Sequence, residues 1–422
     1  MDLQKNSALQ DLLSQHLKDL TTCEGLSEAE ILAGIKSGHM VLLGNPKHPN
    51  LSPCLIGQPA RVKVNANLGT SPLSSCLESE LEKVKVALKA ETDTIMDLST
   101  AGDLDKIRAA MLESCPKPLG TVPIYAVGKN LIDADRGIPT MQPDELFAEI
   151  SKQCAQGVDF ITVHCGLSKR GADLAKKNRT LGIVSRGGSM LAKWMLTNKQ
   201  ENPLLTYFDK LLEICRPYNV TLSLGDGLRP GAGSDAGDAA QFEEVLNLDL
   251  LCQRAQEYGV QCMIEGPGHM SLDKVAGQIQ AIKLLTHKAP LYVLGPLVCD
   301  SSPGYDHIAG AIGGAIGVQA GVDFLCYLTP AEHLTLPDEE DVRLGVYASR
   351  VAAHAGEIAL GRKHALAREA AMNCARRNLD WEGMQKAALD PSMVEKRHAV
   401  EKTEDTCAMC GKFCAVKMLK DI

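Results

Sequence analysis

The sequence predicts an α/β protein whose central part is a (β/α)8 TIM barrel. Short apolar runs rich in β-branched residues recur along the chain, helical segments separate most of them, and the alternation lasts from residue 59 to residue 337. Strands that alternate with helices form parallel βαβ units, and eight such units close a barrel. A doubly wound open sheet is the competing architecture.

The strands are expected in runs with few polar interruptions, because both faces of a parallel sheet are covered. The runs that fit are ARVKVNANL, DTIMDLS, TVPIYAV, DFITVHC, LGIVSR, VTLSLGDG, VQCMIEGP, LYVLGPL and DFLCYLTP. These are nine candidates for eight places in a barrel, so one assignment is expected to be wrong.

The segments between the strands have one apolar face, as helices that cover a sheet do. In residues 144–157 this face contains Phe147, Ile150 and Cys154, and residues 207–219 repeat the pattern. The least polar long stretch, residues 308–325, is rich in glycine and carries Gln319 and Asp323. We interpret it as a closely packed interior helix and not as a membrane span.

Two further regions flank the barrel. A small N-terminal helical arm and linker are expected in residues 1–58, where GNPKHPNLSP has the composition of a linker. The barrel is expected in residues 59–337. Residues 338–422 are expected to form a helical C-terminal region that ends in the cysteine-rich tail CAMCGKFC.

Composition narrows the possible functions. Of the 422 residues 45% are hydrophobic, which is enough for a substantial core, whereas aromatic residues make up only 4% and the net charge is −8. These values argue against nucleic-acid binding. No signal peptide is apparent, and 15 cysteines without secretion indicate a reducing cytoplasm, free thiols and a possible metal site.

Polar residues follow almost every predicted strand. In a barrel the C-terminal strand ends form one rim, which carries the active site. Any one of these residues could be an ordinary loop residue, but structural loops need only turn formers, so the repetition predicts a site on this rim. The candidates are Asn65, Asn67, Met96, Asp97, Ser99, Tyr125, His164, Ser185, Arg186, Asp226, Arg229, Glu265 and His269.

One of these segments, SRGGSMLAKW, could bind a phosphate. A strand is expected to lead through Gly187 and Gly188 into a helix whose first N–H groups are free, with Arg186 beside them. Arg229 in DGLRPG could be a second anion-binding group. A plain turn between strand and helix is the alternative.

The tail has three cysteines, Cys407, Cys410 and Cys414, in the pattern C-x2-C-x3-C. Structural zinc usually takes four ligands, and His398 could complete a Cys3His site. The alternative is an iron–sulfur cluster that keeps one iron open for another ligand. The spacing alone leaves both readings open.

The motifs together resemble one family. The ordered series VKVNANLG, DTIMDLST, GTVPIY, GIVSRGGS, SLGDGLRPG, MIEGPGH, LGPL, PGYDHI, CYLTPAEHL and CAMCGKFC is similar to the ThiC family of radical S-adenosylmethionine enzymes, from about Asn45 to Cys414. The resemblance implies a (β/α)8 barrel, usually a homodimer, with a 4Fe-4S cluster in the tail. It also implies that S-adenosylmethionine binds the open iron and is cleaved to a 5′-deoxyadenosyl radical. That radical attacks 5-aminoimidazole ribonucleotide, with an electron donor such as flavodoxin or ferredoxin.

The resemblance also implies residue roles. Cys407, Cys410 and Cys414 would bind the cluster, and His269 and His333 would bind zinc or another divalent metal near the S-adenosylmethionine. The ribonucleotide would contact Asn67, Met96, Tyr125, His164, Ser185, Arg186, Gly187, Asp226, Gly227, Leu228, Arg229, Glu265 and Tyr292.

Several positions depart from the family's thiamin-pathway enzymes. Those enzymes read VPIYQA and MDLSTGG, where this chain has Ala126 and Ala101, and Cys299, Ser301 and Ser302 also differ. The last two cysteines are one residue closer than in long members, but shorter members tolerate this variation, and it is the positions beside the site that matter for the product. These differences lead us to expect the family's other activity, formation of 5-hydroxybenzimidazole for anaerobic cobamide (vitamin B12) synthesis.

Two other functions stay open. The first is formation of 4-amino-5-hydroxymethyl-2-methylpyrimidine phosphate for thiamin synthesis, from the same substrate. The more remote second is a barrel lyase or binding protein whose tail is only a structural zinc site.

Overall fold

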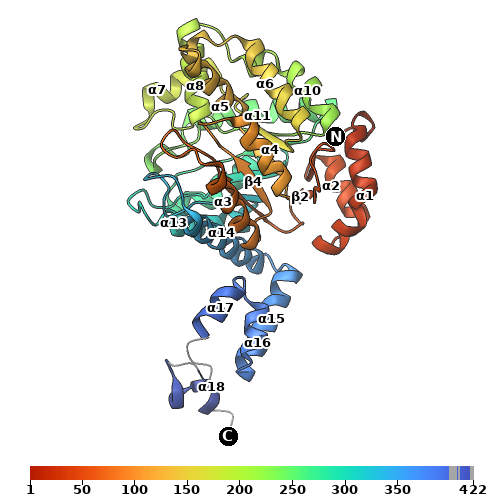
Figure 1. Ribbon diagram of the computed structural model, residues 1–422, viewed down its shortest axis with the longest axis vertical. Coiled ribbons are helices and arrows are strands. Elements are labelled where there is room, and N and C mark those ends of the chain that lie inside the picture. Colours follow the sequence, from red (N-terminus) through yellow and green to blue (C-terminus); the bar gives the residue numbers. More distant parts are fainter. Residues whose placement is uncertain (399–405, 407–408, 419–422) are drawn as a thin grey trace. The chain divides into compact units, whose positions relative to one another are not determined.

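The structure is a computed structural model that describes residues 1–398, 406 and 409–418 (Figure 1). The chain divides into two compact units, Met1–Gly356 and Glu357–Ile422. The domain boundaries predicted at residues 58 and 337 stay predictions.

The first unit contains a closed barrel of eight parallel strands, which confirms the predicted fold class and replaces the open-sheet alternative. The strand order is β10-β3-β4-β5-β6-β7-β8-β9. The bounds are β3 (Lys63–Leu68), β4 (Thr94–Asp97), β5 (Leu119–Thr121), β6 (Phe160–Val163), β7 (Thr221–Leu224), β8 (Cys262–Glu265), β9 (Leu291–Leu294) and β10 (Phe324–Cys326).

The register of the strands brings site candidates to one level. Asn67 of β3 pairs with Met96 of β4, and Glu265 of β8 pairs with Tyr292 of β9. Asn67, Met96 and Glu265 stand near the C-terminal ends of their strands, and the register brings Tyr292, which is near the start of β9, beside Glu265.

Helices follow the strands and cover the barrel (Figure 1). Their bounds are α3 (Leu77–Lys89), α4 (Leu104–Ser114), α5 (Pro123–Asp133), α6 (Pro143–Gln156), α7 (Lys169–Asn178), α8 (Arg186–Asn198), α9 (Pro203–Thr206), α10 (Phe208–Cys215), α11 (Ala239–Tyr258), α12 (Leu272–Leu285), α13 (Asp306–Ala320) and α14 (Glu339–Ala359). The apolar faces predicted for α6 and α10 are buried.

The apolar, glycine-rich stretch forms α13 and then leads into β10. Four of its glycines are buried, and a Cβ on Gly313 would lie 2.1 Å from the carbonyl oxygen of Pro296. Glycine is therefore required for this close packing. Among the described residues no helix is both long and apolar enough to cross a membrane.

One predicted strand is wrong, and it is LGIVSR. Residues 181–185 form a loop, and Arg186 begins α8. The N–H groups of Thr180 and Leu181 donate to the carboxylate of Asp235, at 3.0 and 3.2 Å, and Ser185 caps the helix. The segment has the composition of a strand, but backbone N–H groups at its start bind the Asp235 side chain and its last residues start a helix, so it does not pair with a neighbouring strand.

A second predicted strand, TVPIYAV, is shorter than expected. Only Leu119–Thr121 is a strand, and Pro123 begins α5, so Tyr125 lies in the first turn of a helix. Proline is favoured at this position because its fixed φ suits a helix and its missing N–H is not needed there.

The N-terminal arm consists of α1 (Ser7–Glu24), α2 (Glu28–Ser37) and a two-stranded antiparallel sheet, β1 (Val41–Leu43) with β2 (Cys54–Ile56). The sheet was not predicted, because its three-residue strands are too short to show a period. Leu9, Ile31, Ile35 and Leu42 belong to one buried apolar cluster. The arm therefore has a small core of its own.

The second unit is helical, as predicted. It contains α15 (Lys363–Asn378), α16 (Trp381–Ala387), α17 (Pro391–His398) and α18 (Ala415–Met418). His398 stacks on Trp381, with ring centroids 4.0 Å apart. Cys407 lies outside the described residues.

Candidate active site

A cavity opens at the C-terminal end of the barrel, with an empty volume of about 510 Å³ that includes its open mouth. Most of the side chains predicted to bind substrate line it: Asn67, Met96, Tyr125, His164, Asp226, Arg229, Glu265 and Tyr292. Further residues complete the lining: Leu98, Val122, Thr162, Gly266, Val293, Leu294 and Cys326.

Asp226 and Arg229 form an ion pair in the loop after β7. Nη1 of Arg229 donates to Oδ1 of Asp226 at 3.0 Å. Burial raises the pKa of Asp226 to about 8, since it outweighs the opposing effect of Arg229, and the nearby Glu265 raises it further. The carboxyl group of Asp226 can therefore hold a proton near neutral pH, or ionise and pair with a cationic group of a ligand.

Glu265 ends β8 and is held by two hydroxyl groups. Thr162 and Ser223 donate to its Oε1 at 2.7 and 2.6 Å. Burial still raises the pKa of Glu265, although both hydroxyl groups favour the ionised form. These two neutral hydroxyl groups therefore hold the carboxyl group of Glu265 in position.

His164 follows β6 and is buried against the start of α8. Burial, with a smaller effect from Arg229, lowers the pKa of His164 to about 3, so the ring is neutral at physiological pH. Oγ of Ser185 lies 3.0 Å from its Nε2 and accepts the N–H of Gly188. A Cβ on Gly187 would lie 2.3 Å from Cε1 of the ring, so this position requires glycine.

A network of amide, hydroxyl and thiol groups forms the wall of the cavity at β3, β9 and β10. Nδ2 of Asn65 donates to Oδ1 of Asn67 at 2.8 Å and to the hydroxyl of Tyr292 at 2.9 Å. Nδ2 of Asn67 lies 3.0 Å from Sγ of Cys326, whose pKa burial raises to about 12. This wall therefore presents neutral groups to a ligand.

The start of α8 has the features of an anion site, although a loop and not a strand leads into it. Arg186 and Gly187 occupy the first positions of α8, whose first N–H groups have no acceptor within the helix. The guanidinium of Arg186 lies over the ring of Tyr125, 4.9 Å from its centroid. Tyr125 lines the cavity, so the positive end of the helix stands beside it.

Gly227 and Leu228 are placed differently from the other candidates. The N–H of Leu228 donates to Glu244 at 2.7 Å, and its carbonyl accepts from Arg179 at 2.6 Å. Gly188 packs on Gly227, because a Cβ there would lie 2.6 Å from the carbonyl oxygen of Gly227. Both residues shape the loop whose neighbours Asp226 and Arg229 reach the cavity.

His269 and His333 lie together, with ring centroids 5.1 Å apart. Nδ1 of His269 is 2.8 Å from Oδ1 of Asp300, and Nδ1 of His333 is 3.3 Å from Oδ1 of Asp306. A carboxylate on Nδ1 is the usual outer partner of a metal-binding histidine and leaves Nε2 for the metal. The pair therefore fits a metal ion, although the described residues contain no cluster of three or more potential ligands.

Comparison with known proteins decides the family. Residues 3–421 match the model of the Radical SAM ThiC family. The chain belongs to this family. It is 48% identical over 418 residues to the phosphomethylpyrimidine synthase of Thermoanaerobacter sp. (strain X514), covering 98% of this chain and 96% of the relative. It is 47% identical to the enzyme of the same name from Geobacter metallireducens, with the same coverage.

A solved structure adds nothing beyond this. The dihydropteroate synthase of Coxiella burnetii is 12% identical, with a TM-score of 0.42, and covers 72% of this chain and 96% of that one. This likeness is too remote to carry an argument.

Membership of the ThiC family implies a 4Fe-4S cluster and S-adenosylmethionine. Of the predicted cluster ligands, Cys410 precedes a short 3-10 turn, Gly411–Phe413, and Cys414 follows it. Neither forms a disulfide. Two thiols at the ends of one turn fit the donor set that a cluster needs. The placement of Cys407 and the metal role of all three cysteines stay predictions.

Thr162, Ser223 and Cys326 were not predicted as site residues of this ThiC-family chain. Thr162 stands two residues before His164, so the period of two in a strand places both side chains on the same face. This signal was available in the sequence. That the hydroxyl of Ser223 reaches Glu265 depends on the register of β7 and β8, which no local pattern gives.

Proposed function

We propose that this chain is a phosphomethylpyrimidine synthase, which rearranges 5-aminoimidazole ribonucleotide to 4-amino-5-hydroxymethyl-2-methylpyrimidine phosphate. The observation that carries the proposal is the near-full-length identity of 47–48% to relatives of that name. These names favour the thiamin product and give no support to 5-hydroxybenzimidazole, which we expected from the sequence.

The positions that suggested 5-hydroxybenzimidazole do not form the cavity. Among the described residues around it, the lining contains neither Ala101 nor Ala126 nor Cys299. Ala126 belongs to a buried apolar cluster that includes Ile95 of β4 and Leu119 of β5, and Cys299 is exposed. A substitution outside the cavity is weak evidence for a different product.

The chain's own residues supply binding and orientation. Arg186 and the first N–H groups of α8 would hold the phosphate of the ribonucleotide, because helix N-termini and arginine both favour phosphate. Asp226 and Glu265 would hold the amino group or the ribose hydroxyls. The neutral wall around Asn67 and Tyr292 would face the imidazole ring.

The cofactor would be held by the tail. Cys407, Cys410 and Cys414 would bind the cluster, which, when bound, supplies the electron for reductive cleavage of S-adenosylmethionine. His269 and His333 would bind zinc or another divalent metal. The electron donor, such as flavodoxin or ferredoxin, the homodimer and the cytoplasmic location stay predictions.

A product assay tests the proposal. The full chain is reconstituted anaerobically with iron, sulfide and reductant, supplied with S-adenosylmethionine and 5-aminoimidazole ribonucleotide, and its product is identified by mass spectrometry. Hydroxymethylpyrimidine phosphate is the expected product. 5-Hydroxybenzimidazole, or no cleavage of S-adenosylmethionine by iron-loaded protein, would overturn the proposal.

A matched pair of variants tests the cluster assignment. Cys410→Ala is expected to abolish cleavage of S-adenosylmethionine, whereas Cys374→Ala, which removes an exposed thiol from α15 of the same unit, is expected to keep it. Iron and acid-labile sulfide are measured on both proteins. Equal iron content and equal cleavage would contradict the assignment.

A further inference from the structure

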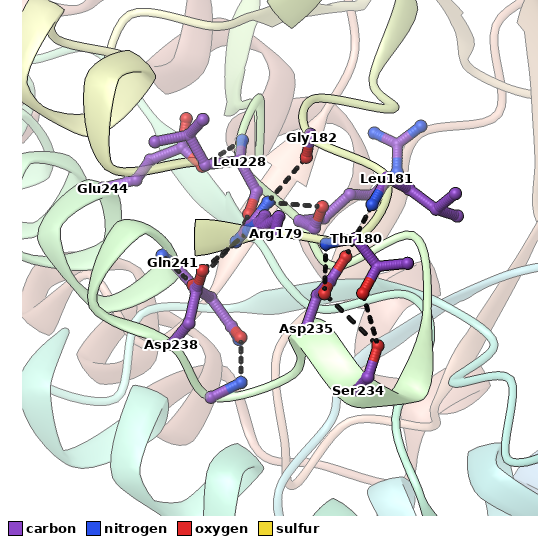
Figure 2. A network of polar contacts seen from close by, with 12 residues as sticks. Arg179, Thr180, Leu181, Gly182, Leu228, Ser234, Asp235, Asp238, Gln241 and Glu244 are labelled. Atoms are coloured by element: carbon purple, nitrogen blue, oxygen red, sulfur yellow. Dashed lines mark hydrogen bonds and ion pairs between the residues drawn. The ribbon is translucent and has the colours of Figure 1, made fainter. Parts of the chain in front are cut away.

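Arg179 uses every donor of its buried guanidinium to join two segments of the site. Its side chain is 0% exposed. Nε and Nη2 donate to the two carboxylate oxygens of Asp238, both at 2.8 Å. Nη2 also donates to the carbonyl of Leu228 at 2.6 Å, and Nη1 to the carbonyls of Arg229 and Gly182, at 3.2 and 3.5 Å. Figure 2 shows this arrangement.

Asp235 joins the same two segments at a second point. Its carboxylate accepts the N–H groups of Thr180 and Leu181, and Oγ1 of Thr180 lies 3.4 Å from Oγ of Ser234 (Figure 2). The two segments are residues 179–186, which lead to Ser185 and Arg186, and residues 226–238, which begin with Asp226 and Arg229. We call them the 179–186 segment and the 226–238 segment.

The start of α11 anchors the whole arrangement. Asp238 is the N-cap of this helix and accepts the N–H of Gln241 at 2.9 Å. Glu244, one turn further, accepts the N–H of Leu228. Burial alone would raise the pKa of Asp238, but the bonds from Arg179 and from the Gln241 N–H hold it below its usual range. Asp238 is therefore ionised and pairs with Arg179 at physiological pH.

Stabilisation of the fold does not by itself explain why an arginine is buried at this position. Burying a guanidinium is expensive, and well-packed apolar residues of similar volume often stabilise a protein as well or better. What an arginine adds is fixed geometry, because its planar fork binds several acceptors at set angles. Here the acceptors are the carboxylate of Asp238 and the backbone carbonyls of Gly182 and of two consecutive residues, Leu228 and Arg229.

We propose that Arg179 is a positioning residue that fixes the 226–238 segment against the 179–186 segment, so that Arg229 and Arg186 can bind one anionic ligand together. The inference rests on the proposed function for the identity of that ligand, 5-aminoimidazole ribonucleotide. Arg179 itself is not part of the cavity lining and acts through the backbone of the two segments.

Arg179→Lys tests the proposal, because lysine keeps the charge but loses the planar fork. Arg108→Lys is the matched control, because Arg108 is also a buried arginine with carboxylate partners. Its side chain is 3% exposed and forms ion pairs with Asp105 of α4 and Glu149 of α6. We expect both variants to unfold at a lower temperature than wild type. Only Arg179→Lys is expected to weaken binding of 5-aminoimidazole ribonucleotide, at least about tenfold by calorimetry of the full chain.

Hydrogen–deuterium exchange supplies a readout that does not depend on the ligand. Arg179→Lys is expected to speed exchange in peptides covering residues 179–186 and 226–238, while peptides from β3 and β4 stay unchanged. Wild-type protein that does not bind the ribonucleotide would count against the proposed function, and the exchange data would still test the positioning role. Wild-type affinity and exchange in Arg179→Lys would overturn the inference, as would an equal loss of affinity in Arg108→Lys.

If Arg179→Lys does not fold, Asp238→Asn takes its place. Asparagine caps helices as well as aspartate does, so α11 keeps its start while the charged pair is lost. The expected result is again faster exchange in both segments and weaker binding of the ribonucleotide. Unchanged values for both would overturn the inference.

Discussion

Asp226 shows how a single residue of the site is set by its surroundings. It lies among Arg229, Glu265 and the apolar barrel, and burial dominates, so its pKa rises to about 8 despite the ion pair with Arg229. In the unfolded chain an aspartate titrates near 3.9. The folded state therefore favours the neutral acid, and ionisation of Asp226 opposes folding.

The sign of this effect predicts a pH dependence of stability. A carboxyl group whose pKa is raised on folding stabilises fully below about pH 4, and the benefit is lost as pH rises toward 8, by at most about 1.4 kcal/mol per pH unit. Asp226→Asn removes this loss. The melting temperature of Asp226→Asn, measured without ligand, is therefore expected to rise relative to that of wild type from pH 5 to pH 8.

Asp273→Asn is the control for this prediction. Asp273 is exposed in the first turn of α12, and its hydrogen bond from Ser271 lowers its pKa, so it does not titrate in this window. Its variant is expected to follow the wild-type curve. Parallel curves for Asp226→Asn and wild type would show that Asp226 is already ionised in the folded protein.

Gly187 predicts a second effect at the scale of one residue. A Cβ there would lie 2.3 Å from the ring of His164, which is itself buried and cannot move freely. Gly187→Ala is therefore expected to cost about 1–3 kcal/mol of stability and to weaken ribonucleotide binding. Thermal unfolding and calorimetry measure the two effects.

Gly277→Ala is the matched control for Gly187→Ala. It lies inside α12 with no atom within 4 Å of the added Cβ. Alanine is expected to stabilise this helix by about 0.5–1 kcal/mol. If Gly187→Ala were as stable as Gly277→Ala, the contact between α8 and His164 would be looser than the structure shows.

The polar residues at strand ends could be predicted because a parallel barrel collects them at one rim. The role of Leu228 could not, since its N–H donates to Glu244 and its carbonyl accepts from Arg179, which lie 16 and 49 residues away in the sequence. The same limit applies to Ser223 and Cys326, whose contacts depend on which strands are neighbours. Strand order and register are properties of the closed sheet and not of any local pattern.

At the scale of elements, the alternation of strands and helices was sufficient to predict the barrel. It failed at LGIVSR, whose composition suits a strand, because Asp235 accepts the N–H of its first residue, Leu181, and that of the preceding Thr180. It also overextended TVPIYAV, where Pro123 begins a helix. Both errors arise at βα connections, where one side chain or one proline decides between strand, loop and helix.

The linker after β1 is joined to the barrel by one buried histidine, His48. His48 lies buried between the linker and the barrel, with Nδ1 2.6 Å from Asp159 and Nε2 2.8 Å from the carbonyl of Cys115. Asp159 also accepts the N–H groups of Asn45 and Leu119. Both ring nitrogens face acceptors, so the imidazolium is the form that these surroundings favour, and its pKa is raised even though burial alone would lower it.

This contact predicts that the linker loosens at alkaline pH. A histidine whose pKa is raised on folding stabilises fully below its unfolded pKa of about 6.5, and the benefit is lost as pH rises through the folded value. His48→Gln is expected to be less stable than wild type at pH 6, with a difference that shrinks toward pH 9. Thermal unfolding across this range measures it.

His287→Asn controls for the loss of a histidine as such. His287 is exposed and has a positive φ of 50°, which asparagine tolerates. Its variant is expected to change stability at pH 6 by less than His48→Gln does, because substitutions of exposed side chains usually have small effects. A constant stability difference for His48→Gln from pH 6 to pH 9 would mean that His48 has the same pKa in the folded and unfolded protein, which would contradict the prediction.

At the scale of the whole molecule, the resemblance of ordered motifs identified the family before the fold was known, and the match over residues 3–421 confirms it. The product was predicted less well. The sequence showed that positions near the site motifs differ from thiamin enzymes, but not that Ala126 packs into an apolar cluster outside the cavity lining. Only the three-dimensional arrangement separates residues that touch a ligand from their neighbours in the sequence.

The division into two units predicts that substrate binding and cofactor binding can be separated. All the residues that line the cavity lie between Asn67 and Cys326, within the unit Met1–Gly356, whereas Cys410 and Cys414 lie in the other unit. A chain that ends after Arg362 keeps α14 whole. It is expected to bind 5-aminoimidazole ribonucleotide within about threefold of the full-length affinity and to cleave no S-adenosylmethionine.

Full-length Cys410→Ala is the matched control, because it removes one predicted cluster ligand while keeping every other residue. It is expected to bind the ribonucleotide with wild-type affinity and, like the shortened chain, to cleave no S-adenosylmethionine. Circular dichroism and thermal unfolding establish that the shortened chain is folded before affinity is compared by calorimetry. A folded, shortened chain that no longer binds the ribonucleotide, beside a Cys410→Ala protein that does, would show that substrate binding requires residues after 362.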